Sequence, residues 1–168
     1  MEHVETERKF LIYMPDTGYL SACNGVCIKN IEQIYLVSDG GVTARVRKIC
    51  EEGKISFIKT VKKRISTLSA YENEYEITPE EYERDLENAD KSKHTIKKTR
   101  YCIPEGKHLI EIDVYPFWTD RAIMEIELSH EDEEFSVPEY IRVIKEVSGD
   151  KRYKNTNLAV NIPNEEIC

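Results

Sequence analysis

The chain has 168 residues, which fits a single domain over residues 1–168 with one substantial core. Its net charge of −8 argues against duplex nucleic acid and anionic membranes as general partners, so a polyanion would need a local basic pocket. No apolar run approaches the roughly 18 residues of a membrane span. The N-terminus also lacks the basic-then-apolar pattern of a signal peptide, and we therefore expect a cytoplasmic protein.

Alternation of apolar and polar residues with a period of two, the pattern of β-strands, dominates the chain. Turn sequences such as Asp39-Gly40-Gly41 and Glu52-Gly53 separate several of the alternating segments. Strands that follow one another at this spacing favour an antiparallel sheet, and eight of them favour closure into a barrel, which removes the exposed edges. Strands are predicted over residues 4–13, 32–38, 42–49, 54–63, 71–77, 95–103, 108–114 and 122–129.

Two helices are predicted between or after these strands. Thr78, Pro79 and Glu81 supply an N-cap, a proline at the first helical position and a capping box, which predict a helix up to about residue 90. A similar capping sequence over 136–139 and an apolar stripe at positions 141, 144 and 147 predict a second helix, ended by Gly149. The remaining residues are basic and then polar, and we expect them to be irregular.

Charged residues recur on one face of separate predicted strands, because residues i and i+2 of a strand point the same way. Acidic pairs at this spacing arise by chance in so acidic a chain. The sorting of the signs is what exceeds chance, since acid pairs lie on some strands and cation pairs on others. The acid pairs are Glu74 with Glu76, Glu111 with Asp113, and Glu125 with Glu127, and the cation pairs are Arg45 with Arg47, and Lys98 with Arg100.

Two arrangements fit this sorting, and the alternation alone leaves both open. In the first, the charged faces are solvated and cross-strand salt bridges contribute about 0.5 kcal/mol each. In the second, the charged faces point into a barrel. Two points count against the first arrangement. Like charges on one strand repel each other, and two short helices can cover only part of an eight-stranded sheet.

If the charges point inward, their chemistry indicates phosphoryl transfer to water. Carboxylate ligands without histidine or thiolate select Mg²⁺ or Mn²⁺. Facing cations suit a compact polyanion, and the planar fork of arginine matches phosphate oxygens. Metals that bridge acids to phosphates, with arginines holding the phosphates, are the usual machinery of that reaction.

The segment Glu5-Thr6-Glu7-Arg8-Lys9 resembles the ExExK signature of the triphosphate tunnel metalloenzymes, also called CYTH proteins. Further matches follow in the family's order at Lys98–Tyr101, Glu111–Val114, Glu125–Glu127 and Asp150–Asn155. The resemblance implies a mainly β, α+β fold. It consists of a closed eight-stranded antiparallel β-barrel around a hydrophilic tunnel, with a few helices packed outside and a C-terminal capping segment.

The resemblance also implies roles for single residues. Divalent metal would be held by Glu5, Glu7, Glu125 and Glu127, with help from Glu111 and Asp113. Triphosphate would be held by Lys9, Arg45, Arg47, Lys59, Lys98 and Arg100. Glu74 and Glu76 would position or activate the attacking water, and Tyr35 would act near a catalytic lysine, for which Lys98 is the candidate.

Some of these residues have a simpler interpretation. Tyr35 could equally be an aromatic residue of the barrel wall with a satisfied hydroxyl. Lys151 and Arg152 would belong to the segment that caps one tunnel mouth, but an exposed basic tail needs no role at all. Trp118 is expected in a loop or an interface, and an exposed aromatic there, next to Phe117, would permit a homodimer.

The leading functional hypothesis is hydrolysis of inorganic tripolyphosphate, a small-molecule triphosphate, to pyrophosphate and phosphate. The short chain leaves little beyond the barrel to bind a base or a thiazole ring. Alternatives within the family are a nucleoside triphosphatase, an adenylate cyclase or a thiamine triphosphatase. A non-catalytic polyphosphate or nucleotide sensor is the alternative from a different class.

Overall fold

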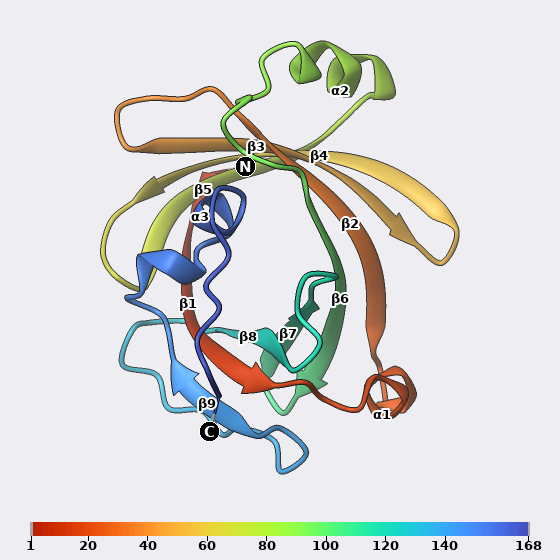
Figure 1. Ribbon diagram of the computed structural model, residues 1–168, viewed down its shortest axis with the longest axis vertical. Coiled ribbons are helices and arrows are strands. Elements are labelled where there is room, and N and C mark those ends of the chain that lie inside the picture. Colours follow the sequence, from red (N-terminus) through yellow and green to blue (C-terminus); the bar gives the residue numbers. More distant parts are fainter. Residues whose placement is uncertain (1, 168) are drawn as a thin grey trace.

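Strand β1 (Glu2–Tyr13) closes the sheet on itself, because it pairs with β5 through Glu2–Thr6 and with β8 through Glu7–Tyr13. In the computed structural model, which describes residues 2–167, the result is a closed antiparallel barrel (Figure 1). The other strands are β2 (Cys27–Leu36), β3 (Val42–Glu51), β4 (Lys54–Arg64), β5 (Ser69–Ile77), β6 (Ile96–Glu105), β7 (His108–Val114), β8 (Arg121–Glu127) and β9 (Val143–Glu146).

The order around the barrel is β1, β5, β4, β3, β2, β6, β7, β8 and back to β1, and every pairing is antiparallel. The predicted fold class and all predicted strands are confirmed. The largest difference in a boundary is the start of β2, which lies at Cys27 rather than at residue 32, since Cys27 already pairs with Cys102 of β6.

The first predicted helix is confirmed as α2 (Pro79–Leu86), and its capping box is formed as expected between Thr78 and Glu81. It lies outside the barrel, where Tyr82 packs against Phe57 of β4 with ring centroids 4.6 Å apart (Figure 1). The helix ends at Leu86, four residues before the predicted end at residue 90, and turn residues follow it.

The second predicted helix is wrong. Residues 136–149 contain no helix, and Val143–Glu146 instead form β9, which pairs with β1 at Phe10–Ile12. Strand β5 pairs only with the first half of β1, so the second half would otherwise present a free edge. A free edge exposes unpaired backbone groups, and here β9 covers it.

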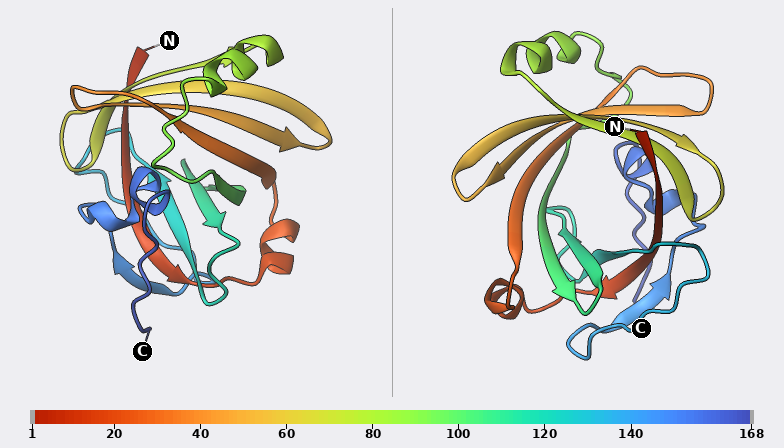
Figure 2. Two further views of the ribbon diagram at one scale, coloured as in Figure 1. Left: turned by 45° about the horizontal axis from the view of Figure 1, so that its top comes forward. Right: turned by 180° about the vertical axis from the view of Figure 1, so that it is seen from behind.

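Three further short helices were not predicted. Helix α1 (Thr17–Ala22) follows β1, with Asp16 as its N-cap. The C-terminal segment, expected to be irregular, forms a 3₁₀ turn over Lys151–Tyr153 and helix α3 (Asn155–Leu158). Figure 2 shows this segment lying against one end of the barrel. Among residues 2–167, no helix is both long and apolar enough to cross a membrane.

Apolar side chains cover the outside of the barrel wall and also plug one end of its interior. On the outside, one cluster spreads from Phe10 and Ile12 over the outer faces of β6, β7 and β8, and α1 contributes Leu20 to it. Inside, Leu11, Tyr35 and Ile123 gather with the C-terminal segment into a second cluster. The charged faces of the strands therefore point inward, as the second of the two arrangements requires.

Trp118 lies in the loop between β7 and β8, as predicted, but it belongs to the interior cluster and is only 6% exposed, so the exposed aromatic predicted there is wrong. Its ring meets Tyr115 and Phe117 edge-on, with centroids 5.7 Å and 5.0 Å apart, and its Nε1 donates to the carbonyl oxygen of Pro163 at 3.3 Å. The aromatic surface that would have permitted a homodimer is thus largely covered by the chain itself.

We expect Trp118→Ala to lower the free energy of unfolding by about 3–5 kcal/mol, because it empties the apolar plug of its largest side chain. Urea unfolding followed by circular dichroism measures the change. Val37→Ala is the control, since Val37 is 69% exposed and should change stability by less than about 0.5 kcal/mol. Equal losses in the two variants would contradict the assignment of Trp118 to the core.

Candidate active site

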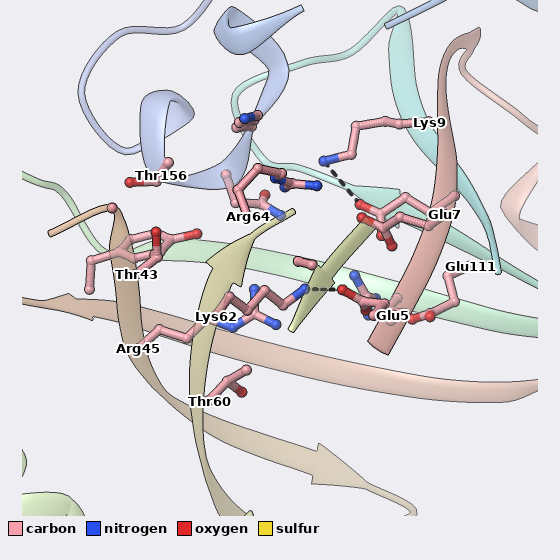
Figure 3. Close-up of a pocket in the computed structure, with 17 residues that line it drawn as sticks. Glu5, Glu7, Lys9, Thr43, Arg45, Thr60, Lys62, Arg64, Glu111 and Thr156 are labelled. Atoms are coloured by element: carbon pink, nitrogen blue, oxygen red, sulfur yellow. Dashed lines mark hydrogen bonds and ion pairs between the residues drawn. The ribbon is translucent and has the colours of Figure 1, made fainter. Parts of the chain in front are cut away.

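The inner face of the barrel encloses a cavity of about 240 Å³. Alternation decides which side chains reach it: on β1 these are Glu5, Glu7 and Lys9, and on β4 Thr60, Lys62 and Arg64. Figure 3 shows the β1 side chains facing those of β3 and β4 across the cavity.

The wall formed by β3 and β4 is cationic. Arg45, Lys62 and Arg64 point into the cavity together with the hydroxyls of Thr43 and Thr60 (Figure 3). Helix α3 and the residue before it close the cavity from one side with Lys154, Asn155 and Thr156. Cations and neutral donors at several angles around a small space are what a compact polyanion requires.

The facing wall, from β1, β7 and β8, is acidic and contains Glu5, Glu7, Glu111 and Glu125. Burial raises the pKa of Glu7 well above its usual range, and the neighbouring Glu125 and Glu5 raise it further. Burial also acts against ionisation of Glu125, but Lys9 and Arg100 outweigh it and hold the pKa of Glu125 well below its usual range. The opposite pKa shifts of these two neighbouring carboxyls show that the site disfavours ionisation of both together.

Lysines neutralise the acids of this wall. Lys62 forms ion pairs with Glu5 and with Glu72, the latter at 2.9 Å from Nζ to Oε2. Lys9 Nζ lies 3.3 Å from Glu125 Oε1. Since unpaired buried carboxylates are costly, these pairs explain how the interior tolerates so many acids.

A second buried charge cluster lies deeper in the barrel. Asp113 accepts hydrogen bonds from Lys98 Nζ at 2.8 Å and from Arg100 Nε at 2.7 Å. Burial and the adjacent Arg100 lower the pKa of Lys98 to about 8, although Asp113 opposes this. Burial tends to raise the pKa of Asp113, but Arg100 and Lys98 lower it to about 2. Of these three residues only Arg100 lines the cavity.

Tyr35 and Lys98, predicted to act as a pair, have different partners. The Tyr35 hydroxyl accepts from Gln33 Nε2 at 2.7 Å, whereas Lys98 Nζ is engaged by Asp113. Within residues 2–167 no hydrogen bond joins Tyr35 to Lys98. Tyr35 itself lines the cavity, while its ring belongs to the apolar plug.

Three predicted substrate-binding residues lie outside the cavity. Lys59 sits on the outer face of β4, because the inward positions of that strand are 60, 62 and 64, and its Nζ pairs with Asp85 of α2 at 2.9 Å. Lys151 and Arg152 are exposed, and Arg152 forms ion pairs with Asp150 and Glu165. Their positions in the cavity wall are taken by Lys62 and Lys154, which the sequence interpretation missed.

The remaining predicted residues border the cavity rather than line it. Arg47 is buried on the same inner face of β3 as Arg45 but does not line the cavity, and Glu74 accepts from it at 2.7 Å and from Thr60 at 2.9 Å. Glu76 and Glu127 occupy exposed positions on their strands. Thr43, Thr60 and Arg64 are missing from the sequence prediction although alternation puts them on the same strand faces as the other cavity residues. The reason is that β3 and β4 carry charges on both faces, so charge alone does not identify the inner face.

The acidic wall supplies only oxygen donors, the kind that Mg²⁺ and Mn²⁺ prefer. Glu7 and Glu125 are buried side by side and repel each other when both are ionised, which fits a place where a divalent cation would relieve the repulsion. No group of three or more acidic, histidine or cysteine side chains converges as a ready-made metal site among residues 2–167. Lys62 and Lys9 hold Glu5 and Glu125 instead, so metal binding requires these ion pairs to open.

Comparisons with known proteins agree with this site. The CYTH domain model matches residues 3–159. An inorganic triphosphatase of Acetivibrio thermocellus is 33% identical over 158 residues, 94% of this chain and 94% of that protein. The solved structure of the inorganic triphosphatase NE1496 is similar over 95% of this chain and 97% of that one, with a TM-score of 0.55 and 27% identity. The PH1819 protein of Pyrococcus horikoshii shares the fold, with a TM-score of 0.59 and 21% identity over 76% of this chain and 80% of that one.

We expect Asp113→Asn to lower the free energy of unfolding by about 3 kcal/mol, because it leaves Lys98 and Arg100 as buried cations without a counter-charge. Urea titration measures the loss. Glu32→Gln is the control, since Glu32 pairs with Lys97 at the surface, where the two side chains are 44% and 66% exposed. A wild-type free energy of unfolding in Asp113→Asn would show that the cluster is not held by its central carboxylate.

Proposed function

This chain belongs to the CYTH domain family, and we propose that it hydrolyses inorganic tripolyphosphate to pyrophosphate and phosphate inside the barrel, in the cytoplasm. The observation that carries the proposal is the cavity of about 240 Å³ with a cationic wall facing an acidic one. Identity of 33% to an inorganic triphosphatase over 94% of the chain supports the choice of substrate.

The size and lining of the cavity favour a substrate without an organic group. Apolar side chains, among them Leu11 and Trp118, plug one end of the barrel interior, and α3 closes another side of the cavity. Within the cavity itself, cations, acids and hydroxyls predominate, which suits a chain of phosphates better than a base or a thiazole ring. A nucleoside or thiamine triphosphate would have to keep its organic group outside.

The cations of the cavity hold the phosphates in this proposal. Arg45, Arg64 and Arg100 can each present a planar pair of N–H donors to phosphate oxygens, while Lys9 and Lys62 act as point charges. Arg47, two residues from Arg45 on the same face of β3 and bonded to Glu74, supports this wall. Lys154 completes the set from the C-terminal segment, the part that the sequence interpretation assigned to Lys151 and Arg152.

The acids divide between metal binding and water. Glu5, Glu7 and Glu125 would hold Mg²⁺ or Mn²⁺, with Glu111 beside them and Glu127 and Asp113 as their neighbours on β8 and β7. Such a cation neutralises phosphate oxygens and stabilises the charge that develops on them. Glu74, which Arg47 and Thr60 hold near the cavity wall, is placed to orient the attacking water, and Glu76 follows it toward the strand end.

Phosphate release from tripolyphosphate, ATP and thiamine triphosphate tests the proposal, with Mg²⁺, Mn²⁺ or a chelator present. We expect tripolyphosphate to be hydrolysed fastest and the chelator to abolish release, because the acidic wall cannot organise the phosphates without its cation. Faster release from ATP or thiamine triphosphate would overturn the substrate choice. Release from none of them would reject the enzyme and leave a polyphosphate sensor, which binding of tripolyphosphate would then reveal.

Lys62→Ala and Lys59→Ala form a matched pair on one strand, since Lys62 lines the cavity and Lys59 faces α2. We expect Lys62→Ala to lower kcat/KM for tripolyphosphate roughly 10- to 100-fold, the effect of losing one charge-assisted hydrogen bond. Lys59→Ala should stay within about twofold of wild type. The reverse pattern would show that the inward face of β4 has been assigned incorrectly. Circular dichroism of both variants controls for folding.

A further inference from the structure

Gln33 is a fully buried amide inside the barrel for which the proposed function has no role so far. It lies on the inner face of β2 and is 0% exposed, between Arg47 of β3 and Ile96 of β6 in the strand register. Burying an amide is costly unless its groups are hydrogen-bonded. Its Nε2 donates to the Tyr35 hydroxyl at 2.7 Å, whereas its Oε1 has no partner within residues 2–167.

The neighbours of Gln33 fix which end of the amide meets Tyr35. Arg47 is paired with Gln33 across the strands, and its buried Nε is also without a partner in the described chain. A guanidinium can only donate, so the amide oxygen is the end that suits the Arg47 side. The NH₂ group is then left for Tyr35, which makes the Tyr35 oxygen an acceptor toward Gln33.

Tyr35 stands at the boundary between the apolar plug and the charged cavity. Its ring packs in the plug and is 3% exposed, and Lys93 Nζ lies 5.2 Å from the ring centroid. Its hydroxyl reaches the cavity wall next to the Arg45 guanidinium and near Lys9. The ring is therefore anchored, and the only freedom left to the hydroxyl is the direction of its proton.

The surrounding donors restrict that direction. A tyrosine hydroxyl has one proton to donate and two acceptor sites. Gln33 occupies one acceptor site, and the positive charge of Arg45 acts on the same hydroxyl. Neither neighbour can accept the proton at these contacts, so the O–H points to the cavity. Burial raises the pKa of Tyr35, which keeps this proton in place at neutral pH.

We propose that Gln33 is a positioning residue that holds the Tyr35 hydroxyl as a hydrogen-bond donor to a phosphate oxygen of the substrate. This inference rests on the proposed hydrolysis of tripolyphosphate and deepens it. Tyr35 then stabilises charge on an oxygen of the reacting phosphate chain and does not remove a proton from water. The neutral Tyr35 hydroxyl adds little to the binding of a polyanion that several cations already hold. Its loss should therefore lower kcat more than it raises KM.

A double-mutant cycle tests the coupling of the two residues. We expect Tyr35→Phe to lower kcat for tripolyphosphate about 100-fold, as for loss of one preorganised donor. Gln33→Leu should lower it about tenfold, with KM changed less than about threefold, because the donor remains but is no longer oriented. The double variant should match Tyr35→Phe within about twofold, since Gln33 acts only through that hydroxyl.

Gln33→Glu distinguishes two possible roles of Gln33, which are orienting the Tyr35 hydroxyl and only supplying a polar group to the barrel wall. A carboxylate there keeps the size and the place opposite Arg47 in the strand register, but it can only accept, so it turns the Tyr35 proton away from the cavity. We expect a loss at least as large as in Gln33→Leu. If Gln33 only satisfies polarity in the barrel wall, this variant should keep wild-type kcat, and the inference falls.

Ile34→Val is the control, because Ile34 is the next residue on β2 and packs on the outer face against the α2 cluster. It should leave kcat unchanged while lowering the melting temperature modestly. Multiplicative effects of Gln33→Leu and Tyr35→Phe, or a wild-type kcat in Gln33→Leu, would overturn the inference alone. Absence of phosphate release from the wild type would reject the proposed function together with it. If Gln33→Leu fails to fold, Gln33→Glu decides.

Discussion

Inside the barrel, buried carboxylates face cations at ion-pair distance, and this neutralisation is what allows charged strand faces to point away from water. Lys62 lies between Glu5 and Glu72, and Asp113 lies between Lys98 and Arg100. In a medium of low dielectric constant the attraction within such pairs is large, but so is the cost of desolvating each partner. The sheet can close with its charges inside only if acids and cations face one another across the bore. The sorting of acids onto β1, β5, β7 and β8 and of most cations onto β3, β4 and β6 provides these opposed walls.

Once the charges point inward, the apolar faces of the same strands point outward and must be covered. This explains why the barrel carries short helices and long connections on its outside. Helix α2 covers Phe57 and Ile77, and α1 with the segment after β8 covers the outer faces of β6, β7 and β8. The apolar plug has a different role, because Leu11 and Trp118 lie inside the barrel. It fills one end of the bore, so the charged cavity has a packed apolar wall against which a polar group such as Tyr35 can be anchored.

The sequence predicted the strands and the closed barrel because alternation is a local property of each strand. It failed where long-range pairing decides. Residues 141, 144 and 147 have helical spacing, but the free edge of β1 recruits this segment as β9. Lys59 and Lys62 cannot be told apart by charge, and only the register of β4 within the barrel turns Lys62 inward. The contribution of Lys154 depends on where the C-terminal segment folds back, which no local pattern specifies. Gln33 was missed because a single amide in a strand carries no chemical signature until its neighbours are known.

The ion pairs of the cavity also bear on how substrate and metal binding depend on each other. Lys62 forms an ion pair with Glu5, and Lys9 forms one with Glu125. A triphosphate that binds these lysines must therefore break both ion pairs. The released carboxylates would then be buried without a counter-charge, a state that costs several kcal/mol. A divalent cation held by Glu5, Glu7 and Glu125 would remove that cost and would supply positive charge to the phosphates. By linkage each ligand strengthens binding of the other by the same factor. The ion pairs that stabilise the barrel therefore couple the binding of metal to the binding of triphosphate. The same charged residues contribute to the stability of the fold and to the proposed reaction.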